Sequence, residues 1–184
     1  MINAIKKIFM LSLMFSAAAV YAQVAPAARG GGQPLWVGGE YSNFVPDYGQ
    51  SNLNGLGVMV DFNFMPKLGA LGEARWLHWS GPGGETQSDY LAGVKYRAFK
   101  FGRLSLNAKF LLGGVWIQFP GSIGSGSYFA YAPGGFVDYR LSRKFLIRGD
   151  YEYQILPSAP NIPPYPSNGL TPHGVSVGVE YSIF

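Results

Sequence analysis

The sequence has no cysteine, few charged residues and no long apolar run beyond its first segment. Because none of the 184 residues is cysteine, neither a disulfide framework nor a cysteine-ligated metal site can form. His173 has no second ligand at metal-binding spacing. After Val20, no stretch approaches the about 18 consecutive apolar residues of a membrane-spanning helix, which excludes a helical membrane protein. We therefore expect no metal site and no cofactor.

The residues that are abundant favour β-structure. Aromatic residues make up 16% of the chain, and its 26 glycines and 12 tyrosines suit short strands and tight turns better than helices. The length and the absence of a long linker indicate one domain. An all-β domain is the simplest expectation.

The N-terminal segment has the parts of a secretory signal peptide. Lys6 and Lys7 precede an apolar run from Ile8 to Val20, and Val20-Tyr21-Ala22 places small residues where signal peptidase recognises them, so we expect cleavage before Gln23. The apolar run is too short for a membrane anchor. Because the two lysines leave with the signal peptide, the formal net charge of +4 does not indicate a nucleic-acid partner.

Eight segments with a period of two follow, each long enough for a tilted strand to cross hydrocarbon. We expect strands at about 34–44, 53–64, 70–80, 88–99, 104–119, 128–141, 144–156 and 172–184. The connections after the second, fourth and sixth segments are short and basic, whereas the others are mostly longer and rich in Gly, Ser, Asn and Pro. This alternation is typical of an outer-membrane barrel with its N-terminus in the periplasm. The chain then divides into a signal peptide (1–22), a flexible lead-in (23–33) and an eight-stranded antiparallel up-and-down transmembrane β-barrel (34–184).

Charged and apolar residues alternate within these segments. In the seventh segment, Ile147 and Tyr151 share one face, and Arg148 and Asp150 share the other. The same phase in every segment places all the strand charges on one face, where we expect a charged lumen. These residues are Glu40, Asp61, Glu73, Arg75, Asp89, Lys95, Arg97, Lys109, Asp138, Arg140, Arg148, Asp150, Glu152 and Glu180.

The reverse arrangement is excluded by its cost in a membrane. A basic residue at the lipid midplane costs roughly 2 to 4 kcal/mol, so a dozen charges facing lipid would cost on the order of tens of kcal/mol. That exceeds a typical folding free energy of about 5 to 15 kcal/mol. Turned inward, the acids and bases can pair across the lumen.

A soluble, lipocalin-like periplasmic barrel would show the same alternation, but with its apolar residues facing the cavity and its charged residues facing water. Two features favour the membrane barrel and an outer-membrane location. Glycines such as Gly57 and Gly93 on the polar face suit a crowded lumen. Apolar-face aromatics gather near the strand ends, as interfacial girdles require. These aromatics are Tyr41, Phe64, Trp76, Tyr90, Tyr96, Trp116, Phe129, Tyr139, Phe145, Tyr153 and Tyr181.

Segments such as LIRGDYEYQI (146–155) and GVSVGVEYSIF (174–184), together with this architecture, give the chain a family resemblance. It resembles the small outer-membrane barrels that include the opacity proteins and the membrane domain of outer membrane protein A. The resemblance implies insertion by the outer-membrane assembly machinery, which recognises a C-terminal strand with a final aromatic residue, here Tyr181 and Phe184. In this chain Tyr181 is one residue out of step with Phe184, so either insertion tolerates the offset or the last strand holds a bulge.

Two sets of residues raise the question of catalysis. His78 and Ser80 lie at the loop end of the third segment and resemble the His-x-Ser pair of the eight-stranded lipid A deacylases. The asparagine-bearing motif of that family is missing. Glu85, in a loop, is only a guess for the acid that would orient the histidine. An interfacial histidine is the plainer interpretation. Asp150 and Glu152 suit a salt-bridge ladder beside Arg148 better than acid–base catalysis.

The functional expectation is a non-enzymatic barrel with a structural or adhesive role at the cell surface. The proline-rich segment from Pro157 to Pro172 predicts an extended, mobile loop outside the cell that offers a surface to an extracellular ligand. Lipid and lipopolysaccharide are the other expected partners. The alternatives are a deacylase-like enzyme, a narrow pore and the soluble binding barrel. A pore is disfavoured because eight strands leave room for little besides side chains.

Overall fold

The computed structural model describes residues 35–47, 52–79, 81, 84–122, 124–159 and 169–183. The predicted signal peptide and lead-in, Ser80 and Phe184 lie outside these ranges. None of the helices among the described residues is long and apolar enough to cross a membrane.

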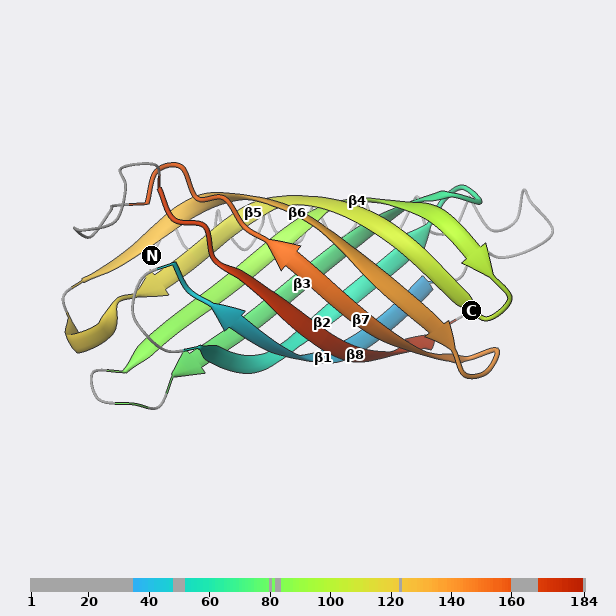
Figure 1. Ribbon diagram of the computed structural model, residues 1–184, viewed down its shortest axis with the longest axis horizontal. Coiled ribbons are helices and arrows are strands. Elements are labelled where there is room, and N and C mark those ends of the chain that lie inside the picture. Colours follow the sequence, from blue (N-terminus) through green and yellow to red (C-terminus); the bar gives the residue numbers. More distant parts are fainter. Residues whose placement is uncertain are drawn as a thin grey trace, which may run out of the picture. The chain divides into compact units, whose positions relative to one another are not determined.

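Eight strands form a closed barrel in which every strand pairs antiparallel with its neighbours in sequence and β1 pairs with β8 (Figure 1). The predicted all-β, eight-stranded antiparallel barrel is therefore confirmed. A short 3-10 turn, Pro120–Ser122, precedes β6. The strands are β1 (Leu35–Val45), β2 (Leu53–Asn63), β3 (Leu68–Trp79), β4 (Glu85–Phe101), β5 (Leu104–Gln118), β6 (Ser125–Arg140), β7 (Phe145–Tyr153) and β8 (His173–Ser182).

Two strands begin earlier than the sequence pattern predicts. β4 starts at Glu85 and β6 at Ser125, whereas the apolar alternation begins only near residues 88 and 128. Their first residues are polar on both faces, so hydrophobicity gives no signal there although the ladder continues. The assignment of Glu85 to a loop is thus wrong: it begins β4, and its side chain is buried.

The two ends of the barrel differ. The short connections β2–β3, β4–β5 and β6–β7 lie at one end, here called the turn end, and the other four lie at the loop end (Figure 1). β1 begins and β8 finishes at the turn end, where Ile183 N donates to Leu35 O at 2.9 Å. In the β4–β5 turn Gly102 has a φ of 57°, a conformation that favours glycine. In bacterial outer-membrane barrels the short turns generally face the periplasm.

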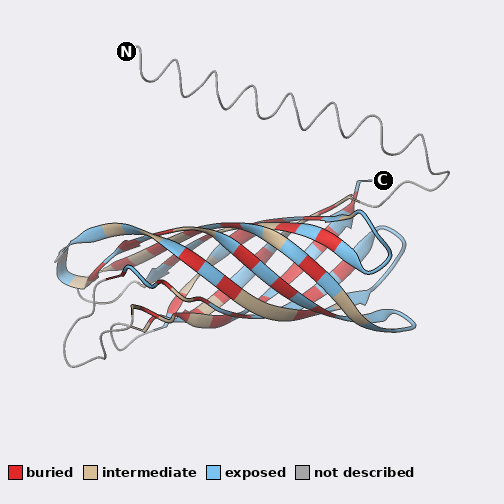
Figure 2. Ribbon diagram, turned by 90° about the horizontal axis from the view of Figure 1, so that it is seen from above, coloured by how far each residue is buried: buried red, intermediate tan, exposed pale blue. Residues whose placement is uncertain are grey.

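Burial alternates residue by residue along the strands (Figure 2). In β7, every second side chain from Leu146 onward is buried and the intervening ones are exposed. The exposed face is apolar: Leu56 and Val177 keep 67% and 61% of their surface accessible, while Arg75 and Glu152 on the other face are fully buried. The soluble, lipocalin-like alternative is wrong, because such a barrel would bury its apolar face and expose its charges.

Candidate functional site

The centre of the lumen is organised around Arg75 on β3, which is fully buried. Its guanidinium forms an ion pair with Glu152 and lies 3.4 Å from Glu73 Oε2 and 3.5 Å from Asp89 Oδ2. Its Nε is 4.0 Å from Glu40 Oε1. Four strands thus contribute carboxylates to one cation, which offsets part of the cost of burying it.

Lys109 on β5 binds the same acidic cluster from another side. Its Nζ lies 2.7 Å from Glu152 Oε2, 2.8 Å from Glu73 Oε1 and 2.9 Å from Asp150 Oδ2. Asp150 and Glu152 therefore pair with a buried cation, and nothing in this geometry leaves a water-accessible acid and base facing a substrate.

A second cluster lies nearer the turn end. Arg148 on β7 donates to Asp61 Oδ2 at 2.7 Å and to Asp138 Oδ1 at 2.8 Å, and it lies 3.0 Å from Glu180 Oε1. Lys95 joins it through Asp61, with Nζ 2.5 Å from Oδ1. The arginine also stacks on the Phe136 ring, 3.8 Å from the centroid.

Two of the charges that the alternation assigns to the lumen lie elsewhere. Arg97 donates to the backbone oxygen of Pro66 at 3.0 Å, and the exposed Arg140 lies 5.6 Å from the centroid of the Trp36 ring. Both are near the turn end, where β4 and β6 reach past the ion-paired lumen. The sequence phase fixes the face of a residue but not its depth along the barrel axis.

Glycines make room for the lumen network. A Cβ added to Gly57 would lie 2.7 Å from Arg75 Cγ and 2.8 Å from Glu40 Oε1, so this side of the lumen has no space for a larger residue.

Apolar side chains fill the lumen between the ion pairs and beyond them towards the loop end. Two clusters of buried hydrophobic residues lie in it, which the expectation of a charged lumen did not include. The larger contains Leu71, Leu91, Leu111, Val115, Ile117, Phe119, Ala130, Ala132, Phe136, Leu156, Ala159 and Leu170, and the smaller contains Phe44, Leu53 and Leu77.

The segment after β7 helps to close this end. Leu156 and Leu170 form an isolated bridge and are almost fully buried in the apolar cluster. Thr171 donates to Asp47 Oδ2 through its amide N at 2.9 Å and through its hydroxyl at 2.7 Å, tying this segment to the end of β1. The described ends of the predicted extended loop therefore pack onto the barrel instead, because Leu156, Ala159 and Leu170 are apolar enough to bury.

The predicted girdle aromatics lie on the outer face. Near the loop end, Trp76 Nε1 donates to Tyr90 OH at 3.0 Å, and the Tyr90 ring lies edge-on to Trp116 at 5.4 Å. Near the turn end, the rings of Phe145 and Tyr181 are 5.2 Å apart. The full predicted set is exposed, namely Tyr41, Phe64, Trp76, Tyr90, Tyr96, Trp116, Phe129, Tyr139, Phe145, Tyr153 and Tyr181.

A row of uncharged polar residues borders the aromatics at the loop end. Six adjacent strands place one such residue each on the outer face, and each residue pairs in register with the next. This polar row consists of Asn43, Asn54, His78, Thr86, Gln118 and Ser125.

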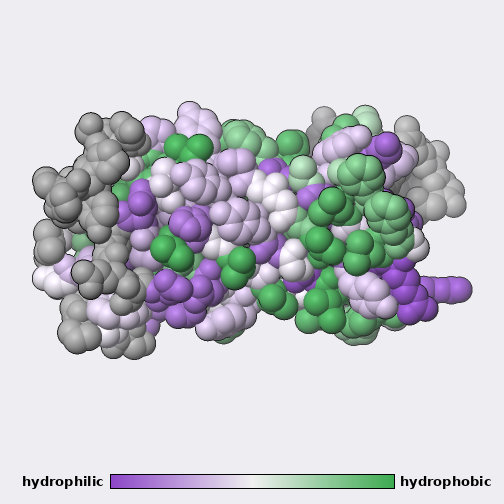
Figure 3. Space-filling model, in the orientation of Figure 1, coloured by the Kyte–Doolittle hydropathy of each residue, from purple (hydrophilic) through white to green (hydrophobic). Residues whose placement is uncertain are grey.

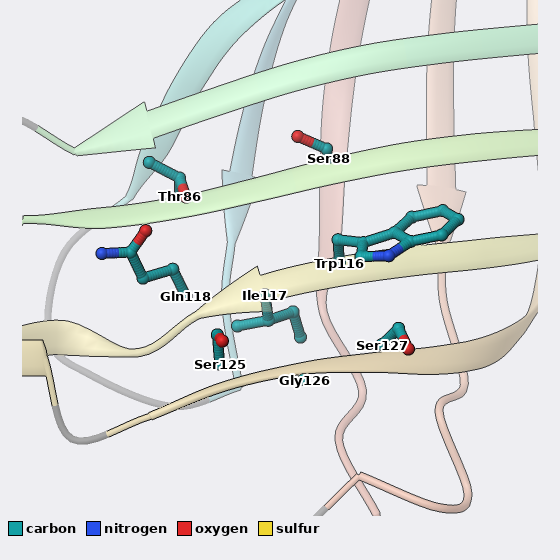
Figure 4. Close-up of a pocket in the computed structure, with 8 residues that line it drawn as sticks. All are labelled: Thr86, Ser88, Trp116, Ile117, Gln118, Ser125, Gly126 and Ser127. Carbon is teal, nitrogen blue, oxygen red and sulfur yellow. The ribbon is translucent and has the colours of Figure 1, made fainter. Parts of the chain in front are cut away.

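A groove on the outer face combines the polar row with the girdle (Figure 4). It has a volume of about 440 Å³. Its side chains come from three adjacent strands, with the Trp116 ring at one end and the Gln118 amide near Thr86 at the other (Figure 4). The lining residues are Thr86, Ser88, Trp116, Ile117, Gln118, Ser125, Gly126 and Ser127. Sequence reasoning misses this groove because it depends on the registers of β4, β5 and β6.

The structure separates the residues of the deacylase hypothesis. His78 is exposed on the outer face, in the polar row, while Glu85 is buried in the lumen. These two side chains lie on opposite faces of the sheet, so Glu85 cannot orient His78. Ser80 lies outside the described residues.

Several solved outer-membrane proteins share this architecture. Ail, the attachment invasion locus protein of Yersinia pestis, solved in complex with the heparin analogue sucrose octasulfate, is 20% identical with a TM-score of 0.55 over 82% of this chain and 97% of its own. Neisserial surface protein A is 11% identical, with a TM-score of 0.62 over 83% and 98%. OprG of Pseudomonas aeruginosa is 13% identical, with a TM-score of 0.56 over 82% and 96%. The sequence matches no protein-family model and no curated protein.

Proposed function

We propose that this chain, a small eight-stranded outer-membrane β-barrel, is a non-enzymatic surface protein that binds an uncharged saccharide at its loop end. The groove beside Trp116 carries the proposal. An exposed aromatic ring gives a sugar an apolar surface to stack on, and the surrounding Ser, Thr and Gln side chains offer the hydrogen-bond donors and acceptors that its hydroxyls need.

The charge distribution favours a neutral ligand over a sulfated one. The loop-end connections, residues 46–52, 80–84, 119–124 and 154–172, contain no Lys or Arg. A polyanion such as the sucrose octasulfate bound by Ail needs cations to pair with. This chain offers hydroxyl and amide groups instead, so the ligand class of Ail is not the one we propose.

The proposal is tested by filling the groove. Ser88→Leu with Ser127→Leu removes two hydroxyls beside Trp116 and occupies the space between them. Because each lost hydrogen bond costs about 0.5–1.5 kcal/mol, we expect binding to neutral glycans to weaken roughly tenfold or more. The measurement is binding of barrel-loaded nanodiscs to an array of neutral glycans.

The matched control adds the same side chains elsewhere on β4 and β5. Ala92→Leu with Ala108→Leu enlarges two exposed residues of the apolar belt and should leave glycan binding unchanged. If the wild type binds no neutral glycan, or if the groove variant binds as well as the wild type, the proposal is wrong.

The filled lumen supports an interaction role over a pore. Ion pairs occupy its centre, and the two apolar clusters fill space around them and towards the loop end. We expect no steady single-channel conductance in planar bilayers, with insertion verified by the heat-dependent gel shift of the folded barrel and a known porin as the positive control. A reproducible conductance step in most insertions would favour the pore.

A further inference from the structure

The charges of this barrel are segregated by sign. All ten acidic residues of the chain are described, and nine of them are strand residues that point into the lumen. The tenth, Asp47, lies at the loop end and accepts hydrogen bonds from Thr171. The apolar belt and the turn end therefore carry no acid on their outer surface.

Among the residues that the structure describes, the basic ones outside the lumen gather at the turn end. They come from all three turns and the strand ends beside them, and we call them the basic rim. The rim consists of Lys67, Arg97, Lys100, Arg103, Arg140, Arg143 and Lys144. Figure 3 shows hydrophilic residues at this end of the barrel, next to hydrophobic residues of the outer face.

Four members of the rim are available for a ligand. Within the described ranges, the side chains of Lys67, Lys100, Arg103 and Arg143 are exposed and form no ion pair or hydrogen bond. Asp138, the acid nearest to the rim along the chain, is bound to Arg148 and to Asn107. No acidic side chain of the described residues forms an ion pair with the rim, which is thus a cationic surface.

The rim lies at the level where lipid headgroups begin. Lys144 Nζ lies 5.7 Å from the centroid of the Tyr181 ring, and Tyr181 packs on Phe145 in the outer aromatic layer. Phe99 and Phe101 stack at 6.2 Å beside Lys100. Aromatic rings of a membrane barrel occupy the interface between hydrocarbon and headgroups, so the adjacent cations reach the phosphates.

We propose that the basic rim binds the anionic headgroups of phospholipids in the periplasmic leaflet. The turn end faces the periplasm, where the lipids of that leaflet surround the barrel. Guanidinium and ammonium groups bind phosphate through charge-assisted hydrogen bonds, and each basic residue near an anionic surface strengthens binding about fivefold. The loop end, with its uncharged polar row, offers no such site.

Lipid selection by the folded barrel tests the proposal. Native mass spectrometry of protein released from nanodiscs of phosphatidylcholine and phosphatidylglycerol counts the lipids that remain bound. We expect phosphatidylglycerol to be retained about fivefold or more over phosphatidylcholine by the wild type. Lys67→Gln, Lys100→Gln, Arg103→Gln and Arg143→Gln together should abolish this preference.

Two further measurements test whether the positive charge of the rim causes the lipid preference. Lys67→Arg with Lys100→Arg keeps the charge and should keep the preference, and the gel shift of each variant reports that the barrel is folded. Raising the salt concentration should weaken the preference, since the rim is exposed. Equal retention of both lipids by the wild type, or an unchanged preference in the Gln variant, would overturn the proposal.

Discussion

Replacing Arg148 with leucine is expected to lower the free energy of unfolding by about 3–5 kcal/mol. The guanidinium is buried and holds the carboxylates of Asp61, Asp138 and Glu180. With leucine at this position, the three acids remain in the lumen, and among the described residues the cation left beside them is Lys95, which is paired to Asp61. Uncompensated buried charges account for most of the expected loss, which is larger than the net contribution of the ion pairs themselves.

The measurement is equilibrium unfolding in urea of the barrel folded into lipid vesicles, followed by tryptophan fluorescence. Arg143→Leu is the matched control, because this arginine is exposed in the β6–β7 turn. It should change the free energy by no more than about 0.5 kcal/mol. Adding Glu180→Gln to Arg148→Leu removes one unpaired carboxylate and should recover part of the loss. A single variant as stable as the wild type would show that water, rather than Arg148, compensates these acids.

Gly93→Ala is expected to destabilise the barrel by about 1–3 kcal/mol although it adds only one methyl group. Gly93 lies on the lumen side of β4, where an added Cβ would collide with the backbone oxygen of Phe110 and lie 2.8 Å from Leu111 Cα on β5. Backbone atoms cannot move aside as the end of a flexible side chain can, so the two strands must separate.

Gly149→Ala is the control for this effect. Gly149 is an exposed glycine of β7, and an added Cβ meets no atom within 4 Å. Alanine there should be neutral or slightly stabilising, because it reduces the conformational freedom of the unfolded chain. The same urea titration compares both variants, and equal behaviour of the pair would rule out close strand approach as the reason for glycine at position 93.

The sequence could predict that the strands exist and which side chains face the lumen. In β7 and β8, for example, apolar and polar residues alternate without interruption. Where the outer face turns polar, as at Thr86 and Ser127, the alternation of hydrophobicity vanishes while the backbone ladder continues, so strand length could not be predicted. The period of two also assigns Leu77, Leu91 and Val115 to the lumen face, but it does not show which apolar residues pack together there.

The candidate sites depend on which residues of different strands lie next to one another, and the sequence does not determine this. That Arg75 meets Glu152 from a strand 77 residues away follows from the stagger of the closed sheet. The groove beside Trp116 likewise needs Ser88 and Ser127 in register with that residue. In contrast, the basic character of the turns is visible in the sequence. The structure was needed only to show that the outer surface beside these turns carries no acidic side chain.

The lumen network has a consequence for how the barrel is assembled. Arg148 on β7 draws its partners from β2, β6 and β8, and Arg75 on β3 draws its own partners from β1, β3, β4 and β7. No hairpin or half barrel contains either set, so a partly inserted sheet would carry unpaired charges into hydrocarbon. We therefore expect the strands to cross the bilayer cooperatively, with the closure of β1 onto β8 completing the neutralisation.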